Sequence, residues 1–255
     1  MAGVLGVGHV YNGYRLGQEG YKNLNEKYVK VIGYSDEKEA ANTETAESSE
    51  SAHEEILPAD APKMSAIDIK GLQQINQDVI GWIEVPAIDV SYPIMQASDN
   101  EYYLHRDIYQ EYLFAGSIFL DCKNNPDIQD QNSILYGHNM RDGSMFARLK
   151  NLRDANKLEE CPYFWIYTET VNHLYRIISV MNTSNESSCY QLEFADDNEF
   201  ESWILEMISS SETESKGIAE ASGRQRKVVT LSTCTENSLV KQVVQGIEIA
   251  SVASK

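Results

Sequence analysis

Two residues of this chain have types and surroundings suited to chemistry, Cys234 and His138. Cys234 closes the pentad Thr230–Cys234 (TLSTC), the end of an apolar run from Val228 that is typical of a strand. A thiolate is the nucleophilic form of cysteine, and a nearby cation or base maintains it. His138 lies upstream in Tyr136–Met140 (YGHNM). Together they indicate covalent catalysis by a cysteine, with a histidine as acid and base.

The other cysteines and histidines are less favourably flanked. No two cysteines have the short spacing of a zinc knuckle or a redox pair, so we expect no metal site and no cofactor. The sequence leaves open the disulfide state of three cysteines: Cys122, Cys161 and Cys189. The remaining histidines are His9, His53, His105 and His173.

Cys234, the candidate nucleophile, lies at the end of a predicted strand, and this strand must hold it in position. Side chains alternate along a strand, so Thr230, Ser232 and Cys234 share one face, while Leu231 and Thr233 share the other. The first face is small and polar, as the floor of a substrate groove would be. His138 follows a second expected strand, and Gly137 before it permits a tight turn.

Short strands dominate the rest of the chain. Such a pattern, with few helices, predicts a mainly β fold, a barrel or a sandwich. An amphipathic helix is expected at 196–210 and a short one at 145–152. The expected strands are 79–85, 88–94, 117–120, 133–136, 163–167, 174–180, 227–233 and 242–250.

Composition divides the chain into three parts. Residues 1–34 have helical character, 35–63 read as an acidic flexible linker, and 64–255 as the globular domain. The first ten residues are too few to cross a membrane, which takes roughly 20 apolar residues. They are either a frayed start or the remnant of a membrane anchor. The net charge of −18 argues against nucleic-acid binding.

Five segments stand out along the chain: 78–83 (DVIGWI), 99–104 (DNEYYL), 116–121 (GSIFLD), 136–146 (YGHNMRDGSMF) and 230–234 (TLSTC). Taken in this order, they resemble segments of class B sortases. The resemblance covers about residues 64–250, and the histidine and cysteine motifs are specific in combination. It implies a closed barrel of about eight strands, with N-terminal helices and a helix before the cysteine strand.

The resemblance also implies an activity. Cys234 would attack the threonine carbonyl of a C-terminal sorting signal, and the thioacyl enzyme would pass to an amine of a peptidoglycan cross-bridge or a pilin lysine. His138 would exchange the protons. The implied setting is the extracytoplasmic face of a Gram-positive membrane, reached through an N-terminal anchor. The implied groove residues are Asn100, Leu104, Tyr136, Ser232 and Thr233.

One motif departs from the family. Sortases carry an arginine before a Val-Val pair on the strand after the cysteine, and here Lys241 holds that place. A lysine keeps the charge without the fixed fork of donors. Alternatively, Arg224 or Arg226, which lie before the cysteine strand, could fold back to take the place of the family's arginine. The chain is thus expected to be a slower transpeptidase. The other possibilities are a thiol hydrolase, or an inactive module that binds sorting-signal peptides.

Overall fold

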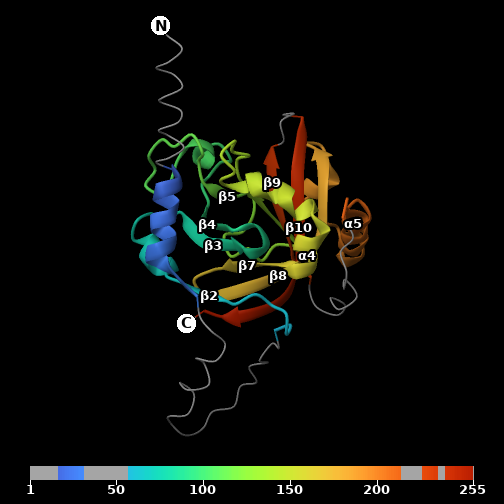
Figure 1. Cartoon of the computed structure of the whole chain (residues 1–255). Coiled ribbons are helices and arrows are strands. Elements are labelled where there is room, and N and C mark those ends of the chain that lie inside the picture. Colours follow the sequence, from blue (N-terminus) through green and yellow to red (C-terminus); the bar gives the residue numbers. More distant parts are fainter. Residues whose placement is uncertain (1–16, 32–56, 214–225, 235–238, 255) are drawn as a thin grey trace.

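A closed eight-stranded β-barrel forms the body of the protein in the computed structural model (Figure 1). The structure describes residues 17–31, 57–213, 226–234 and 239–254. Around the barrel the strands run β10-β8-β7-β3-β4-β5-β6-β9. The pairs β4/β5 and β6/β9 are parallel and the others are antiparallel. The expected mainly β barrel is confirmed.

The barrel strands fall close to where the sequence pattern predicts them. Their bounds are β3 Val79–Val85, β4 Val90–Met95, β5 Ile118–Leu120, β6 Asn132–Tyr136, β7 Tyr163–Tyr167, β8 Val171–Ser184, β9 Val228–Cys234 and β10 Val240–Ala253. The last two antiparallel partners, β8 and β10, extend beyond the apolar runs that predicted them. The extra residues at their ends are of mixed polarity, and they continue the antiparallel pairing of the two strands.

Two apolar clusters show how alternation places side chains on either wall of β9. Val229 and Leu231 join the large apolar cluster that contains buried residues of all eight barrel strands. Val228 instead joins a smaller cluster outside the barrel wall, with Val243 and residues of helix α5. The face that carries Val228, Thr230, Ser232 and Cys234 is therefore the outer face of the barrel.

Helix α5 (Asp197–Ser209) covers part of this outer face, as Figure 1 shows. Asp196 caps it by accepting a hydrogen bond from the Glu199 amide. Its apolar stripe is buried over the barrel wall and comprises Phe200, Trp203, Ile204 and Met207. The predicted helix before the cysteine strand is confirmed. The short helix expected at 145–152 is the 3-10 helix η3 (Phe146–Arg153), preceding α4 (Ala155–Glu160).

A helix over residues 17–28 packs on the other side of the barrel (Figure 1). Tyr21, Leu24 and Tyr28 bury into the same core as the strands, and the Tyr21 hydroxyl donates to the Gly116 carbonyl at 2.6 Å. Within the expected helical segment 1–34, the described helix ends at residue 28, earlier than the sequence pattern predicts. Residues Val29–Val31 form strand β1, which pairs with β2 (Ser65–Ile67) before helix α3 (Ile69–Gln73). Strand pairing across the intervening segment overrides local helical propensity.

Some expectations fall on residues outside the described ones. These are the anchor remnant at 1–10, most of the acidic linker, Arg224 and the side chain of Cys234. Among the helices that the structure describes, none is both long and apolar enough to span a membrane.

Candidate active site

The end of β9 brings the nucleophile strand beside two further elements of the predicted site. Cys234 lies directly opposite Lys241 in the antiparallel register of β9 and β10. On its other side β9 runs parallel to β6, where Ser232 is level with Tyr136. The Gly137 amide then donates to the Ser232 carbonyl at 3.1 Å. The loop that carries His138 therefore starts beside Ser232, two residues before the cysteine.

Glycine is required at position 137 by packing rather than by its backbone angles. A Cβ atom there would lie 2.4 Å from the end of Ile118 and 2.8 Å from the ring of Phe146. The Phe146 amide also donates to the His138 carbonyl at 3.1 Å. The histidine loop is thus held against the barrel by its own neighbours, which limits the positions that His138 can take.

A backbone carbonyl sets the protonation of the His138 ring. His138 Nε2 lies 2.8 Å from the Leu104 carbonyl oxygen, and because a carbonyl only accepts, Nε2 carries the hydrogen. Nδ1 is left as the atom that can take up and release a proton. Gly116 supports this arrangement, since any Cβ at its positive φ would fall 2.2 Å from the Leu104 oxygen.

The surroundings of His138 favour its neutral form. Burial lowers the pKa of its imidazole, the Leu104 carbonyl raises it, and the charges of His105 and Lys241 lower it further; the net shift is downward. At neutral pH the ring is therefore mainly neutral, able to accept a proton at Nδ1.

The register decides which residue of β10 shares a face with Cys234. Directly opposed residues of an antiparallel pair point to the same side of the sheet. Lys241 therefore faces the side of Cys234, while Gln242, opposite Thr233, is 6% exposed on the other. The positive charge of Lys241 also lowers the pKa of His138.

The side chains of Asn100 and Tyr136 both bond to the buried carboxylate of Asp121. Asp121 lies in one of the sequence motifs, but the motif does not indicate its role. Asp121 Oδ2 accepts from the Asn100 amide at 2.9 Å and from the Tyr136 hydroxyl at 3.0 Å. The Asn100 side-chain oxygen in turn accepts from the Cys122 amide. Burial and the negative charge of Asp121 raise the pKa of Tyr136, which stays a neutral donor.

Ser232 has a partner that sequence analysis missed. Its hydroxyl lies 2.7 Å from the Tyr190 hydroxyl, in the 3-10 helix η4 (Ser188–Tyr190). Nothing in the local pattern around Tyr190 marks it, because the contact joins segments far apart in the chain.

Two expectations about β9 differ from what the structure shows. Thr233 is 4% exposed and lies on the face opposite Cys234, so its side chain does not line the same surface. Thr230 does share the face of Cys234, yet it is fully buried and bonded to Asn132 and Gln245. The polar face of β9 is therefore covered as far as Ser232, which is 3% exposed.

The three other cysteines are free thiols. Burial raises the pKa of Cys189 to about 11, and burial also raises the pKa of Cys161. Both are therefore poor sources of thiolate at neutral pH.

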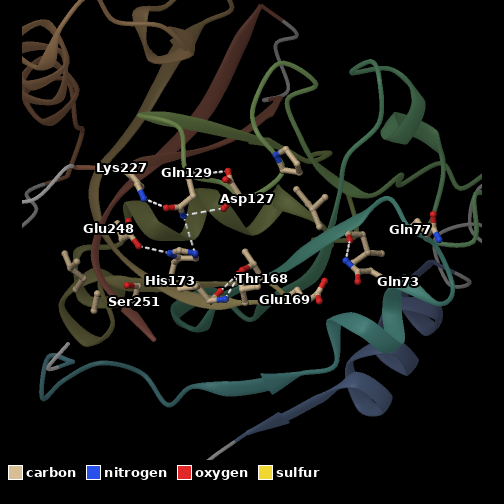
Figure 2. Close-up of a pocket in the computed structure, with 17 residues that line it drawn as sticks. Gln73, Gln77, Asp127, Gln129, Thr168, Glu169, His173, Lys227, Glu248 and Ser251 are labelled. Atoms are coloured by element: carbon tan, nitrogen blue, oxygen red, sulfur yellow. Dashed lines mark hydrogen bonds and ion pairs between the residues drawn. The ribbon is translucent and has the colours of Figure 1, made fainter. Parts of the chain in front are cut away.

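A concavity of about 710 Å³ lies at the end of β10 away from Lys241 (Figure 2). Ser251 in its lining is roughly 30 Å along the strand from Lys241. A chain of polar contacts crosses it, from Glu248 to His173 at 2.6 Å, then to Gln129 and Lys227. His173 is 4% exposed, so this chain ties β8 and β10 to Gln129 and to Lys227, which directly precedes β9.

Breaking this chain is expected to cost stability. Glu248→Ala should lower the free energy of unfolding by about 1–3 kcal/mol, because it leaves the buried His173 ring without its acceptor. Urea denaturation followed by tryptophan fluorescence measures the change. Glu248→Gln, which keeps an acceptor oxygen, is the matched control and should lose less. Equal stability of all three proteins would contradict a structural role for the pair.

Comparison with known proteins agrees with this geometry. The sortase domain profile matches residues 83–246. Sortase B of Listeria monocytogenes is 33% identical over 246 residues, covering 95% of this chain and 92% of the relative. A structure of Bacillus anthracis sortase B superposes with a TM-score of 0.71 at 27% identity, covering 94% and 99% of the two chains. A Staphylococcus aureus sortase B–substrate complex gives 0.65 at 25% identity, covering 71% and 84%.

The profile spans more than half of the chain and includes both the histidine and the cysteine motifs. The Listeria relative aligns over nearly the whole length of both proteins. The chain therefore belongs to the sortase family, whose members are cysteine transpeptidases of the Gram-positive cell surface, and the relatives that it matches are class B sortases.

Proposed function

We propose that this protein cleaves a C-terminal sorting signal after threonine and joins the released acyl group to an amine. The observation that carries the proposal is the placement of Lys241 opposite Cys234, with the loop of His138 anchored to Ser232 of the same strand. This arrangement would bring a nucleophile, a proton carrier and a positive charge together at the carboxyl end of β9. The S. aureus sortase B–substrate complex shows that a related barrel binds substrate.

In the first half-reaction the Cys234 thiol gives its proton to Nδ1 of His138 and its sulfur attacks the threonine carbonyl carbon. Negative charge develops on the carbonyl oxygen, and Lys241 stabilises it electrostatically. The carbon–nitrogen bond then breaks as His138 returns the proton to the leaving amine. The products are a thioester on Cys234 and the released C-terminal segment.

In the second half-reaction an amine attacks the thioester. His138, neutral again, removes a proton from the incoming nitrogen, and the thiol is restored when the carbon–sulfur bond breaks. The acceptor is an amine of a peptidoglycan cross-bridge or a lysine of a pilin. The lowered pKa of His138 suits this step, because the base must be neutral when the amine arrives.

The peptide would lie at the carboxyl end of β9. Tyr136 and Asn100, oriented by Asp121, and Ser232, oriented by Tyr190, offer polar contacts there. Leu104 bounds the groove on the side of His138. In the cell, we place the enzyme on the outer face of the membrane of a Gram-positive bacterium, tethered by an N-terminal anchor.

The lysine favours a second possibility, in which turnover is weak or absent. Lys241 offers a point charge where relatives offer a planar fork, so the oxyanion would be held less firmly. The protein would then bind sorting-signal peptides and release them unchanged, or lose the acyl group to water.

A quenched fluorescent peptide library, incubated with and without triglycine, tests these functions. Transpeptidation predicts a product joined to triglycine, detected by mass spectrometry. Cleavage that yields the free acid at the same rate with and without the amine would indicate a hydrolase. Peptide binding without cleavage would indicate a binding module. Neither binding nor cleavage of any Thr-containing peptide would overturn the proposal.

A further inference from the structure

A second histidine stacks on His138. The ring centroids of His105 and His138 lie 5.3 Å apart with an interplanar angle of 16°. His105 is also nearly parallel to Phe114, at 6.0 Å and 20°. Three rings from two separate segments thus form a near-parallel series that ends at His138. The sequence pattern does not single out His105, which is one of the less favourably flanked histidines.

The fold fixes the place of His105. It is the last residue of the 3-10 helix η2 (Tyr102–His105), directly after Leu104, whose carbonyl orients His138. Its own Nδ1 lies 3.3 Å from the Phe114 carbonyl and donates to it. The backbone adds a third constraint, because the Leu113 amide donates to the His105 carbonyl at 3.0 Å.

The chain between His105 and Phe114 folds back on itself, which keeps the stack in place. Asp107 accepts hydrogen bonds from the amides of Tyr109 and Glu111. The backbones of Arg106 and Tyr112 form an isolated antiparallel β-bridge. The segment nevertheless lies at the surface, and Tyr112 is 76% exposed. His105, itself exposed, is therefore open to protons from solvent while in ring contact with the half-buried His138.

Two cations bear on the His138 ring in the part of the chain that the structure describes. They are His105 from η2, when protonated, and Lys241 from β10. Both charges oppose protonation of His138. Two stacked imidazole rings repel each other when both are charged, so a charge on one disfavours a charge on the other.

We propose that His105 is a positioning residue for His138: its stacked ring holds the His138 imidazole in the orientation seen here, and its charge, when present, opposes a second charge on that imidazole. This inference rests on the proposed function, in which neutral His138 removes the proton. The stacking and the charge can be separated by substitution, because phenylalanine keeps the ring and loses the charge.

The decisive experiment is an NMR titration of His138 that needs no catalysis. Histidine-labelled Cys234→Ala protein is compared with the same protein carrying His105→Phe. The pKa of His138 is expected to rise in the second protein, because a charge that opposes protonation is gone. Arg106→Gln is the control: it removes a neighbouring cation that packs over Tyr102, and should leave the His138 titration unchanged. An unchanged titration in His105→Phe overturns the inference.

Rates in the Cys234 enzyme test the positioning. His105→Ala should lower kcat on the order of tenfold at alkaline pH, with little change in KM, because His138 loses its ring contact. His105→Phe should restore most of that loss at alkaline pH but not at acidic pH. If His105→Ala matches the wild type at alkaline pH, the positioning role is wrong. If the NMR shift occurs but the acidic limb of the rate profile does not follow it, the ring coupling stands and the base assigned to His138 fails.

Discussion

Cys234→Ala is expected to abolish both cleavage and transfer, with kcat/KM falling by about ten-thousand-fold or more. The thiol is the group that forms the covalent intermediate, and no other described residue replaces it. Fluorescence of a quenched sorting-signal peptide measures the loss. Intact-mass spectrometry adds a direct test, because the wild-type protein should gain the mass of the acyl peptide and the variant should not.

Cys161→Ala is the matched control. Cys161 is also a free thiol, but it is half-buried, lies before β7, and has a pKa raised by its burial. Its removal should leave turnover within about twofold of the wild type. Circular dichroism confirms that both variants fold. Cleavage by Cys234→Ala at the wild-type rate would overturn the entire catalytic assignment.

Lys241→Met carries the second largest expected effect. It keeps the length of the side chain and removes the charge that faces the side of Cys234. We expect kcat to fall roughly 100- to 1000-fold, the loss typical of one oxyanion stabiliser. The pKa of His138 should also rise in this variant, because Lys241 lowers it in the wild type. Steady-state kinetics and the same NMR titration measure the two effects independently.

Lys241→Arg should act in the opposite direction and raise kcat/KM. A guanidinium supplies the charge together with a rigid pair of donors that a lysine lacks. Gln242→Leu is the companion control, since Gln242 lies on the face opposite Cys234. A neutral or harmful result for Lys241→Arg, together with a neutral result for Lys241→Met, would mean that Lys241 does not take the place of the family's arginine.

Helix α5 and the barrel strands were predictable because their signals are local. Phe200, Trp203 and Ile204 recur at helical spacing behind a capping aspartate, and each strand is a short apolar run. Strand β1 was not, because Val29–Val31 becomes a strand only through pairing with Ser65–Ile67. A pattern read along the chain contains no information about a partner that lies beyond an intervening segment.

The candidate site likewise contains features that the sequence predicts and features that only the tertiary structure shows. Cys234 and His138 stand in short motifs, so their types and order are visible in the sequence. The motifs do not show that the Leu104 carbonyl fixes the His138 tautomer. Nor do they reveal Tyr190 beside Ser232, because each of these contacts joins distant segments.

The sequence by itself determined the fold class, the family resemblance, the nucleophile candidate and the histidine candidate. Alternation shows only that Lys241 and Gln242 lie on opposite faces, and the family motif pointed to Lys241. The tertiary structure shows that Lys241 is the residue opposite Cys234, because facing depends on the register between β9 and β10. It also decided that His105 lies against His138. Both facts are set by how strands and loops pack in three dimensions, where a shift of one residue exchanges the two faces.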